Sequence, residues 1–252
     1  MTMCHIMVGF EGHNGRLDGS LVTARGLHGC LYTVLKEHNA NEAGWLHAHS
    51  SPKPYSMAPY YRDDGQLMGL RMAAIGERAA ALLVMGWRQA QQSGQLLHLG
   101  PQALTVRAVE WMPGPGFAQF AGSPAGREVG LRFLSPTTFR QGPGELPLPL
   151  PGNVFSWPLR VWQAYAPPVL TVPGDWLDWC KRDVFVTGHR IETAVISLSK
   201  TVNLTGFVGE VNFRARAGHT DYLYIWQAIS DLAAFCGIGY KTTMGMGAVE
   251  RI

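Results

Sequence analysis

The sequence predicts an α+β protein with tandem ferredoxin-like halves, each an antiparallel sheet with helices on one face. Two observations predict it. Strands and helices follow one another in a similar order in each half of the 252 residues. The second half also holds two long extended runs, Val184–Ser199 and Gly206–Ala217, joined by a turn near Asn203. Adjacent strands of this kind argue against a parallel, doubly wound sheet, in which strands and helices alternate strictly.

The first half divides into elements by hydrophobic period. Extended runs are apolar or alternating, and helices carry apolar residues near a 3.6-residue spacing. The predicted strands are Cys4–Phe10, Tyr55–Tyr60, Gln66–Ile75 and Leu104–Trp111. The predicted helices are Leu17–Leu35, Glu42–His49 and Gly76–Ser93. A turn at Arg62–Gly65 separates the second and third strands, and Gly94 ends the last helix.

The run Pro113–Gly116 breaks this pattern and predicts a domain boundary in the stretch Pro113–Arg127. We expect an N-terminal domain at 1–118 and a C-terminal domain at 119–252. The C-terminal half then has its own predicted elements, besides the two long strands. They are a strand at Val129–Leu134, a loop at Gln141–Gly152, helices at Val154–Tyr165, Asp175–Arg182 and Asp221–Phe235, and a last strand at Ala248–Ile252.

Composition excludes some classes of protein. With 46% hydrophobic and 15% charged residues, the chain is expected to fold around an ample core. A net charge of +3 permits a nucleic-acid partner without requiring one. The four cysteines form no CxxC pair, which disfavours a zinc ribbon or redox motif and favours buried thiols in a reducing compartment. No secretory leader or membrane span is expected, so we predict a cytoplasmic protein.

A glycine-rich segment follows the last predicted helix. Its glycines are spaced as GxGxxxxxGxG, at Gly237, Gly239, Gly245 and Gly247. Glycine permits positive φ, and exposed N–H groups on such a loop suit phosphate oxygens, with charge added by Lys241 beside Thr242. The segment matches neither the Walker loop nor the dinucleotide fingerprint, because it follows a helix and leads into a strand. The alternative is a tight connector from helix to strand.

In this position, Gly237–Val249 resembles the C-terminal signature of the CRISPR repeat-processing endoribonucleases. These form the Cas-six family of the repeat-associated mysterious proteins. Three other segments also resemble that family, so the likeness runs nearly the whole length. They are Gly206–Val211, Leu131–Arg140, and Leu46–His47 followed by Lys53–Pro59.

The resemblance implies RNA cleavage without a metal or cofactor. The 2′-hydroxyl would attack the adjacent phosphate, leaving a 2′,3′-cyclic phosphate and a 5′-hydroxyl. His47 matches the family's catalytic histidine and would be general acid or base. Lys53 would stabilise the phosphorane charge, and Tyr32 would transfer a proton or orient a group. His38 and His49 are rival histidines.

Other side chains have a structural interpretation beside the functional one. His28, His98 and His189 are interpreted as surface or core residues. Trp176 and Trp179 could stack bases but are better explained as core. Arg214 and Arg216 alternate along a strand, where they could track phosphates. His47 and His49 could be a metal pair, yet i and i+2 positions of a helix face apart.

The expected partner is CRISPR repeat RNA, both precursor and mature guide. Subunits of a CRISPR effector complex and a second copy of the chain remain open as further partners, and no membrane is expected. Two rivals to the nuclease also remain open. One is a non-catalytic subunit that binds guide RNA in an effector complex. The other is a generic ferredoxin-like RNA-binding module, which would show exposed aromatics on its sheet.

Overall fold

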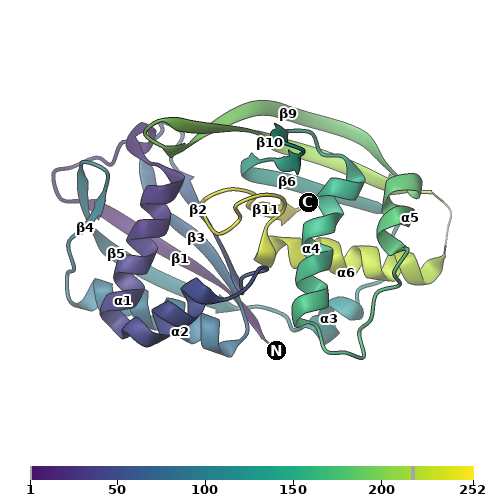
Figure 1. Ribbon diagram of the computed structural model, residues 1–252, viewed down its shortest axis with the longest axis horizontal. Helices are drawn as coiled ribbons and strands as arrows, with labels where there is room; N and C mark the ends of the chain where they lie inside the picture. Colours follow the sequence, from purple (N-terminus) through teal and green to yellow (C-terminus); the bar gives the residue numbers. More distant parts are fainter. Residues whose placement is uncertain (1, 217–218) are drawn as a thin grey trace.

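The computed structural model describes residues 2–216 and 219–252, and contains two principal antiparallel sheets (Figure 1). The first sheet has the order β2-β3-β1-β5-β4. Its strands are β1 (Met3–Gly12), β2 (Tyr55–Tyr61), β3 (Leu67–Ile75), β4 (Leu97–Leu99) and β5 (Gln102–Pro113). The second has the order β11-β6-β10-β9. Its strands are β6 (Glu128–Thr137), β9 (Val184–Ser199), β10 (Val202–Ala215) and β11 (Val249–Arg251).

Both sheets share one topology once the short edge strand β4 is set aside. In each, the first strand lies between the last and the third, and the second strand is at the edge. This is the arrangement of a β-α-β-β-α-β unit. The predicted tandem ferredoxin-like fold is confirmed.

Two helices, α1 (Ala24–Ala48) and α2 (Glu77–Gln92), pack against the first sheet. Thr23 caps α1, because its side chain accepts a hydrogen bond from the N–H of Gly26 at 3.0 Å. A single 3-10 turn, η1 (Gly19–Leu21), precedes it, so the helix begins later than the predicted residue 17. Asn39 has φ −158° and ψ 100°, which kinks α1. The two helices predicted from sequence are therefore the two arms of one kinked helix.

The second core lies between the second sheet and four helices. These are α3 (Phe117–Ala121), α4 (Pro151–Tyr165), α5 (Trp176–Asp183) and α6 (Thr220–Cys236). Trp176 and Trp179 are 0% and 2% exposed, so their core interpretation is confirmed. Both aromatic rings of α3 also belong to this core, and the division at 118/119 stays a prediction. A small hairpin, β7 (Phe139–Gln141) with β8 (Gly144–Leu146), extends into the segment predicted to be loop.

The two halves share packing around α6. Met3, Ala73 and Ile75 of the first sheet belong to the second core. The His5 ring stacks on the Phe235 ring with centroids 4.1 Å apart. The end of α6 is thus held against the free face of the first sheet.

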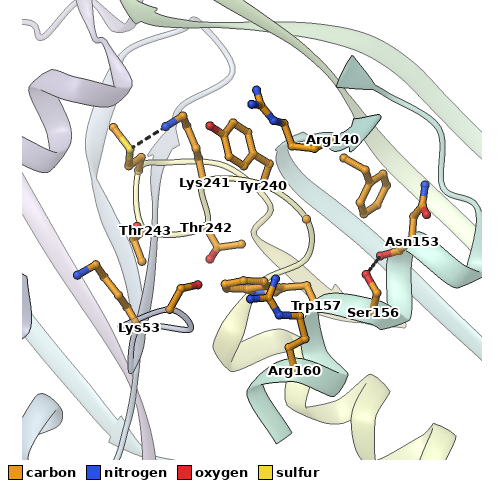
Figure 2. Close-up of a pocket in the computed structure, with 14 residues that line it drawn as sticks. Lys53, Arg140, Asn153, Ser156, Trp157, Arg160, Tyr240, Lys241, Thr242 and Thr243 are labelled. Carbon is orange, nitrogen blue, oxygen red and sulfur yellow. Dashed lines mark hydrogen bonds between the residues drawn. The ribbon is translucent and has the colours of Figure 1, made fainter. Parts of the chain in front are cut away.

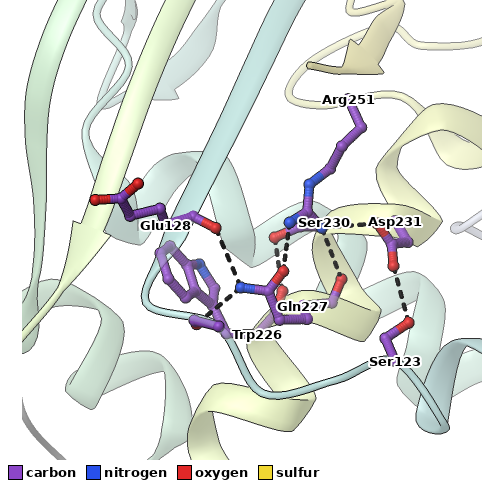
Figure 3. A network of polar contacts seen from close by, with 8 residues as sticks. Ser123, Glu128, Trp226, Gln227, Ser230, Asp231 and Arg251 are labelled. Carbon is purple, nitrogen blue, oxygen red and sulfur yellow. Dashed lines mark hydrogen bonds and ion pairs between the residues drawn. The ribbon is translucent and has the colours of Figure 1, made fainter.

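A polar network fixes the C-terminal strand to the same helix (Figure 3). Arg251 forms an ion pair with Asp231 at 2.7 Å and also contacts Gln227. The Gln227 amide donates to the carbonyls of Gly126 and Glu128, at 2.8 and 3.2 Å. The network therefore links the start of β6, the middle of α6 and the end of β11.

The long β9–β10 hairpin reaches across to the first half (Figure 1). Near its tip, Leu198 and Leu204 pack with Ala24 of α1 and with Met246. The turn lies at Lys200–Thr201, slightly before the predicted Asn203, which instead pairs with Ser197 across the hairpin. All four cysteines are buried and free, as predicted. Among the described residues, no helix is long and apolar enough to cross a membrane.

Candidate active site

The glycine-rich segment, Gly237–Ala248, runs between α6 and β11 and lies between the two halves (Figure 1). Its four glycines all have positive φ, of 69°, 84°, 103° and 72° in chain order. A Cβ on Gly239 would lie 2.5 Å from the Thr138 carbonyl oxygen. Lys241, with φ 58°, also adopts the left-handed region. All four glycines thus adopt the positive φ that their residue type permits, and a role of the loop in RNA binding stays a prediction.

Much of this loop's backbone is bound to the protein. On one side, Met57 N–H donates to Thr242 O at 2.9 Å, and Gly245 N–H donates to Met57 O at 3.1 Å. On the other side, Tyr240 N–H donates to Thr138 O and Gly247 N–H to Pro136 O. The loop therefore joins the edge strand β2 to the end of β6. The amides of Gly245 and Gly247 serve this junction and are not free for a phosphate.

The start of the loop is fixed by side chains from both halves. The Ser56 hydroxyl donates to the carbonyl of Phe235 at 2.8 Å, and Trp157 Nε1–H donates to that of Cys236 at 3.2 Å. These carbonyls end α6 and have no partner within the helix ladder. The loop's origin is therefore rigidly placed relative to β2 and α4.

Three rings from α1 gather beside the loop. Tyr32 and His47 meet edge to face with centroids 5.0 Å apart. His28, one turn before Tyr32, lies 4.7 Å from Tyr32 and 6.1 Å from His47, again between centroids. The kink at Asn39 lets the second arm of α1 bring His47 back towards the first. His28, which was interpreted from the sequence as a surface or core residue, thus lies in the predicted site. Its position one helical turn before Tyr32 was the signal that could have found it.

The Tyr32 hydroxyl connects this cluster to the loop. It lies 3.4 Å from the hydroxyl of Tyr55, which in turn hydrogen-bonds the side chain of Thr243. Both phenols are buried. Burial raises the pKa of Tyr32, although the hydrogen bond from Tyr55 opposes that shift. Tyr32 therefore remains protonated at neutral pH.

Lys53 is bound at the end of α1. Its ammonium donates to the carbonyl oxygens of Leu46 at 3.0 Å, His47 at 2.7 Å and His49 at 3.0 Å. An ammonium has three donors, and all three are used here. The cation also neutralises the negative end of the helix dipole. Partial burial lowers the Lys53 pKa.

The surroundings of His28 perturb its pKa. Burial lowers the pKa of His28 most, and the nearby His47, Lys53 and Lys241 lower it further. A cationic neighbourhood disfavours imidazolium, so His28 is held in its neutral form near pH 7. A neutral imidazole can accept a proton.

The rival histidines lie elsewhere. The ring of His38 is 2.7 Å from the side-chain oxygen of Gln89 on α2. His49 Nδ1 is 2.8 Å from the Ser50 carbonyl oxygen, and its ring stacks against Tyr165. Neither joins His28 and Tyr32. Among residues 2–216 and 219–252, no three His, Cys, Asp or Glu side chains gather so that they could hold a metal ion.

A cavity of about 580 Å³ opens next to the cluster, between α4, β7 and the loop (Figure 2). We call it the α4 cavity. Lys53 and Lys241 line it, as does Thr242, whose side chain is mostly buried. The prediction from the sequence did not include the other polar and aromatic lining residues, among which are Arg140, Asn153, Ser156, Trp157, Arg160 and Tyr240. The i, i+3 and i, i+4 spacing of Asn153, Ser156, Trp157 and Arg160 on α4 was the signal for a shared face.

The two arginines predicted to track phosphates are not part of this cavity. Arg214 lies near the end of β10 and forms an ion pair with Glu128 at 2.6 Å. Arg216 follows the strand, and its N–H donates to the Asp183 carbonyl. A contact between these residues and RNA stays a prediction.

Residues 131–249 match the family model described as "CRISPR-associated endoribonuclease Cas6". This part of the chain is a Cas6 domain. Cas6 endoribonucleases from two strains of Mycobacterium tuberculosis are 29% identical over 148 residues, 58% of this chain. The match spans 46% of those relatives, about half of their length.

Solved Cas6 structures share the fold over the whole chain. Thermus thermophilus Cas6 has a TM-score of 0.77 and 22% identity, covering 100% of this chain and 99% of its own. A Cas6 product complex reaches 0.85 at 23% identity, with 100% and 99% covered. A Cas6 substrate mimic complex reaches 0.78 at 23% identity, with both chains covered fully. The resemblance that the sequence motifs suggested is thus confirmed for the family and the fold.

Proposed function

We propose that this chain is a metal-independent endoribonuclease that cuts CRISPR precursor RNA within its repeats. The observation that carries the proposal is the ring cluster His28–Tyr32–His47, placed beside Lys53 and Lys241 where α1 meets the loop. The Cas6 domain and the Cas6 product and substrate mimic complexes support the RNA substrate.

The reaction is a transesterification. The 2′-oxygen forms a bond to phosphorus while the bond from phosphorus to the 5′-oxygen breaks, which leaves a cyclic phosphate and a 5′-hydroxyl. One group must accept the proton of the 2′-hydroxyl, and another must protonate the 5′-oxygen. Two histidines suit this pair of transfers, because imidazole accepts or donates a proton near neutral pH.

We assign the two transfers to His47 and His28. His28, whose pKa is lowered by burial and nearby cations, is neutral near pH 7 and is therefore available to accept a proton. His47 is exposed at the surface of the cluster, where a leaving oxygen can reach it. Tyr32 is held by Tyr55 and is protonated, so it orients the His47 ring instead of accepting a proton.

Negative charge on the phosphorane needs a cation nearby. Lys53 lies close to His47, but its ammonium is committed to three carbonyl oxygens. Lys241, whose Nζ is 3.6 Å from the Met244 sulfur, has a weaker hold and can turn towards a phosphate. We therefore propose that Lys53 orders the end of α1 and that Lys241 contacts RNA.

One experiment tests the proposal. The protein is incubated in EDTA with repeat RNA from its own locus, and with the same RNA carrying a 2′-deoxy nucleotide at the cleavage site. Cleavage of the first RNA alone, with a cyclic phosphate on the product, is the expected result. His47→Ala and His28→Ala should each abolish it. Failure to cut any repeat RNA that the protein binds would instead indicate a non-catalytic guide-RNA-binding subunit.

A further inference from the structure

The α4 cavity has a lining whose chemistry the cleavage reaction does not use. Two arginines, Arg140 from β7 and Arg160 from α4, lie at its margins, together with the rings of Tyr240 and Trp157 (Figure 2). Its volume of about 580 Å³ is in the range of small-ligand sites, about 300–1,000 Å³. The cavity is therefore large enough for a single nucleotide.

Each arginine is supported by an aromatic ring. The Arg140 guanidinium carbon lies 5.1 Å from the centroid of Tyr240, and that of Arg160 lies 5.4 Å from Trp157. The Lys241 ammonium is also over Tyr240, at 4.7 Å. Cation–π contacts act through the ring face and leave the N–H donors free. Among the described residues, neither arginine forms an ion pair or a side-chain hydrogen bond.

The charge around the cavity is unbalanced. No carboxylate belongs to its described lining, although Glu145 is opposite Arg140 in the β7–β8 register. On the second sheet, by contrast, an arginine is paired with carboxylates: Arg132 forms ion pairs with both Glu210 and Glu250. Uncompensated cations next to aromatic rings match a phosphate joined to a base, since stacking and charge act together in binding single strands.

We propose that the α4 cavity binds one unpaired nucleotide of the RNA, adjacent to the phosphate that is cut. The base stacks on Tyr240 or Trp157, and its phosphates bind Arg140 and Arg160. The Asn153 and Ser156 side chains also line the cavity and supply polar atoms for a base edge. Lys53 lines the cavity and contacts the His47 carbonyl, so the two sites are neighbours. The inference rests on the proposed function for its RNA substrate.

The test uses binding and not cleavage. Repeat RNA with a 2′-deoxy nucleotide at the cleavage site is labelled, and its affinity is measured by fluorescence anisotropy. An abasic nucleotide is then placed at each position in turn. We expect one unpaired position at which the abasic RNA binds about 5- to 150-fold more weakly.

Tyr240→Leu keeps an apolar side chain but removes the stacking face. This variant should bind the intact RNA more weakly by a similar factor. It should cause no further loss of affinity for the RNA that is abasic at the sensitive position. Additive losses at every position would overturn the assignment. The exposed double variant Arg140→Ala/Arg160→Ala should reduce the salt slope of binding by about 1.4, at about 0.7 per single-strand phosphate contact. Arg88→Ala, exposed on α2, is the matched control.

The outcomes separate the two proposals. A loss of affinity at one abasic position, without any cleavage, would overturn the nuclease proposal and support the nucleotide site. The nucleotide site would be overturned if the RNA is cleaved, the salt slope is unchanged in the double arginine variant and no abasic position weakens binding. That result would leave the nuclease proposal in place. No binding to any RNA would overturn both. If Tyr240→Leu does not fold, the arginine variants carry the test, since both side chains are exposed.

Discussion

The Lys53 ammonium lies 2.7 Å from the carbonyl oxygen of His47, at the end of the helix arm that carries the proposed catalytic ring. It reaches the carbonyls of Leu46 and His49 as well. The lysine thus holds the backbone of the histidine, while the histidine ring faces Tyr32. On this relationship we propose that Lys53 is a positioning residue.

Lys53→Met should therefore lower stability as well as cleavage. Losing charge-assisted bonds at a helix C-terminus should reduce the free energy of unfolding by about 1–3 kcal/mol. Urea denaturation and single-turnover cleavage measure the two effects, with Lys36→Met, exposed on α1, as the control. Normal stability together with lost cleavage would argue for direct contact between Lys53 and the phosphate.

His47→Ala should slow cleavage by about 10²- to 10⁴-fold, the usual contribution of a general acid or base. RNA affinity should change little, because the exposed ring is not bound to a cation or to the loop. His49→Ala is the matched control, since its ring stacks on Tyr165 away from the cluster. Equal effects of both variants in single-turnover assays would count against the assignment.

The pH dependence of cleavage should reflect the protonation of His28. A proton acceptor must be neutral, and burial with nearby cations lowers the His28 pKa below its ordinary value of about 6.5. The acidic limb of kcat/KM should thus lie below that value. Lys241→Gly, which suits the left-handed backbone, removes one cation and should move the limb to higher pH. Arg88→Ala should leave it in place; a limb unmoved by Lys241→Gly would argue against His28.

Gly239→Ala should destabilise the loop. Its φ of 84° disfavours alanine, and the new Cβ would meet the Thr138 carbonyl oxygen at 2.5 Å. We expect a loss of about 1–3 kcal/mol in the free energy of unfolding. Gly44→Ala, in the α1 helix with nothing within 4 Å of the new Cβ, should be neutral or stabilising. Equal free energies of unfolding for the two variants would contradict this account.

Stability should fall in mild acid through His5. Burial and the Arg71 charge lower the pKa of this histidine, which stacks on Phe235 between the halves. Below about pH 6.5 the unfolded chain binds a proton that the folded chain resists, so unfolding is favoured as pH falls. His5→Phe keeps the ring and should flatten the pH dependence of urea midpoints. The pKa of His28 is also lowered by folding, so a smaller pH dependence of the urea midpoint should remain in the His5→Phe variant.

The order of elements could be predicted from the sequence because it depends on local patterns. Strands β2 and β3 and helices α2 and α6 lie within two residues of their predicted bounds. The positive φ of the four glycines follows from the residue type and spacing. The hairpin β7–β8 was missed, because a Pro- and Gly-rich segment carries no strand period.

The candidate site could be predicted only in part. Tyr32, His47 and Lys53 were found by resemblance, and the structure brings them together. His28 and the arginines of the α4 cavity were missed. Their neighbours come from α4, β7 and the loop, far apart in the chain, and no period or spacing predicts such contacts.

The sequence by itself thus determined the two ferredoxin-like units and the loop's need for glycine, because hydrophobic period and φ preference act over a few residues. Tertiary structure alone decided that the loop amides join β2 to β6, that Lys53 binds carbonyls, and which cations remain uncompensated. Each of these depends on packing between halves, as in the Ser56 bond to Phe235, which spans 179 residues.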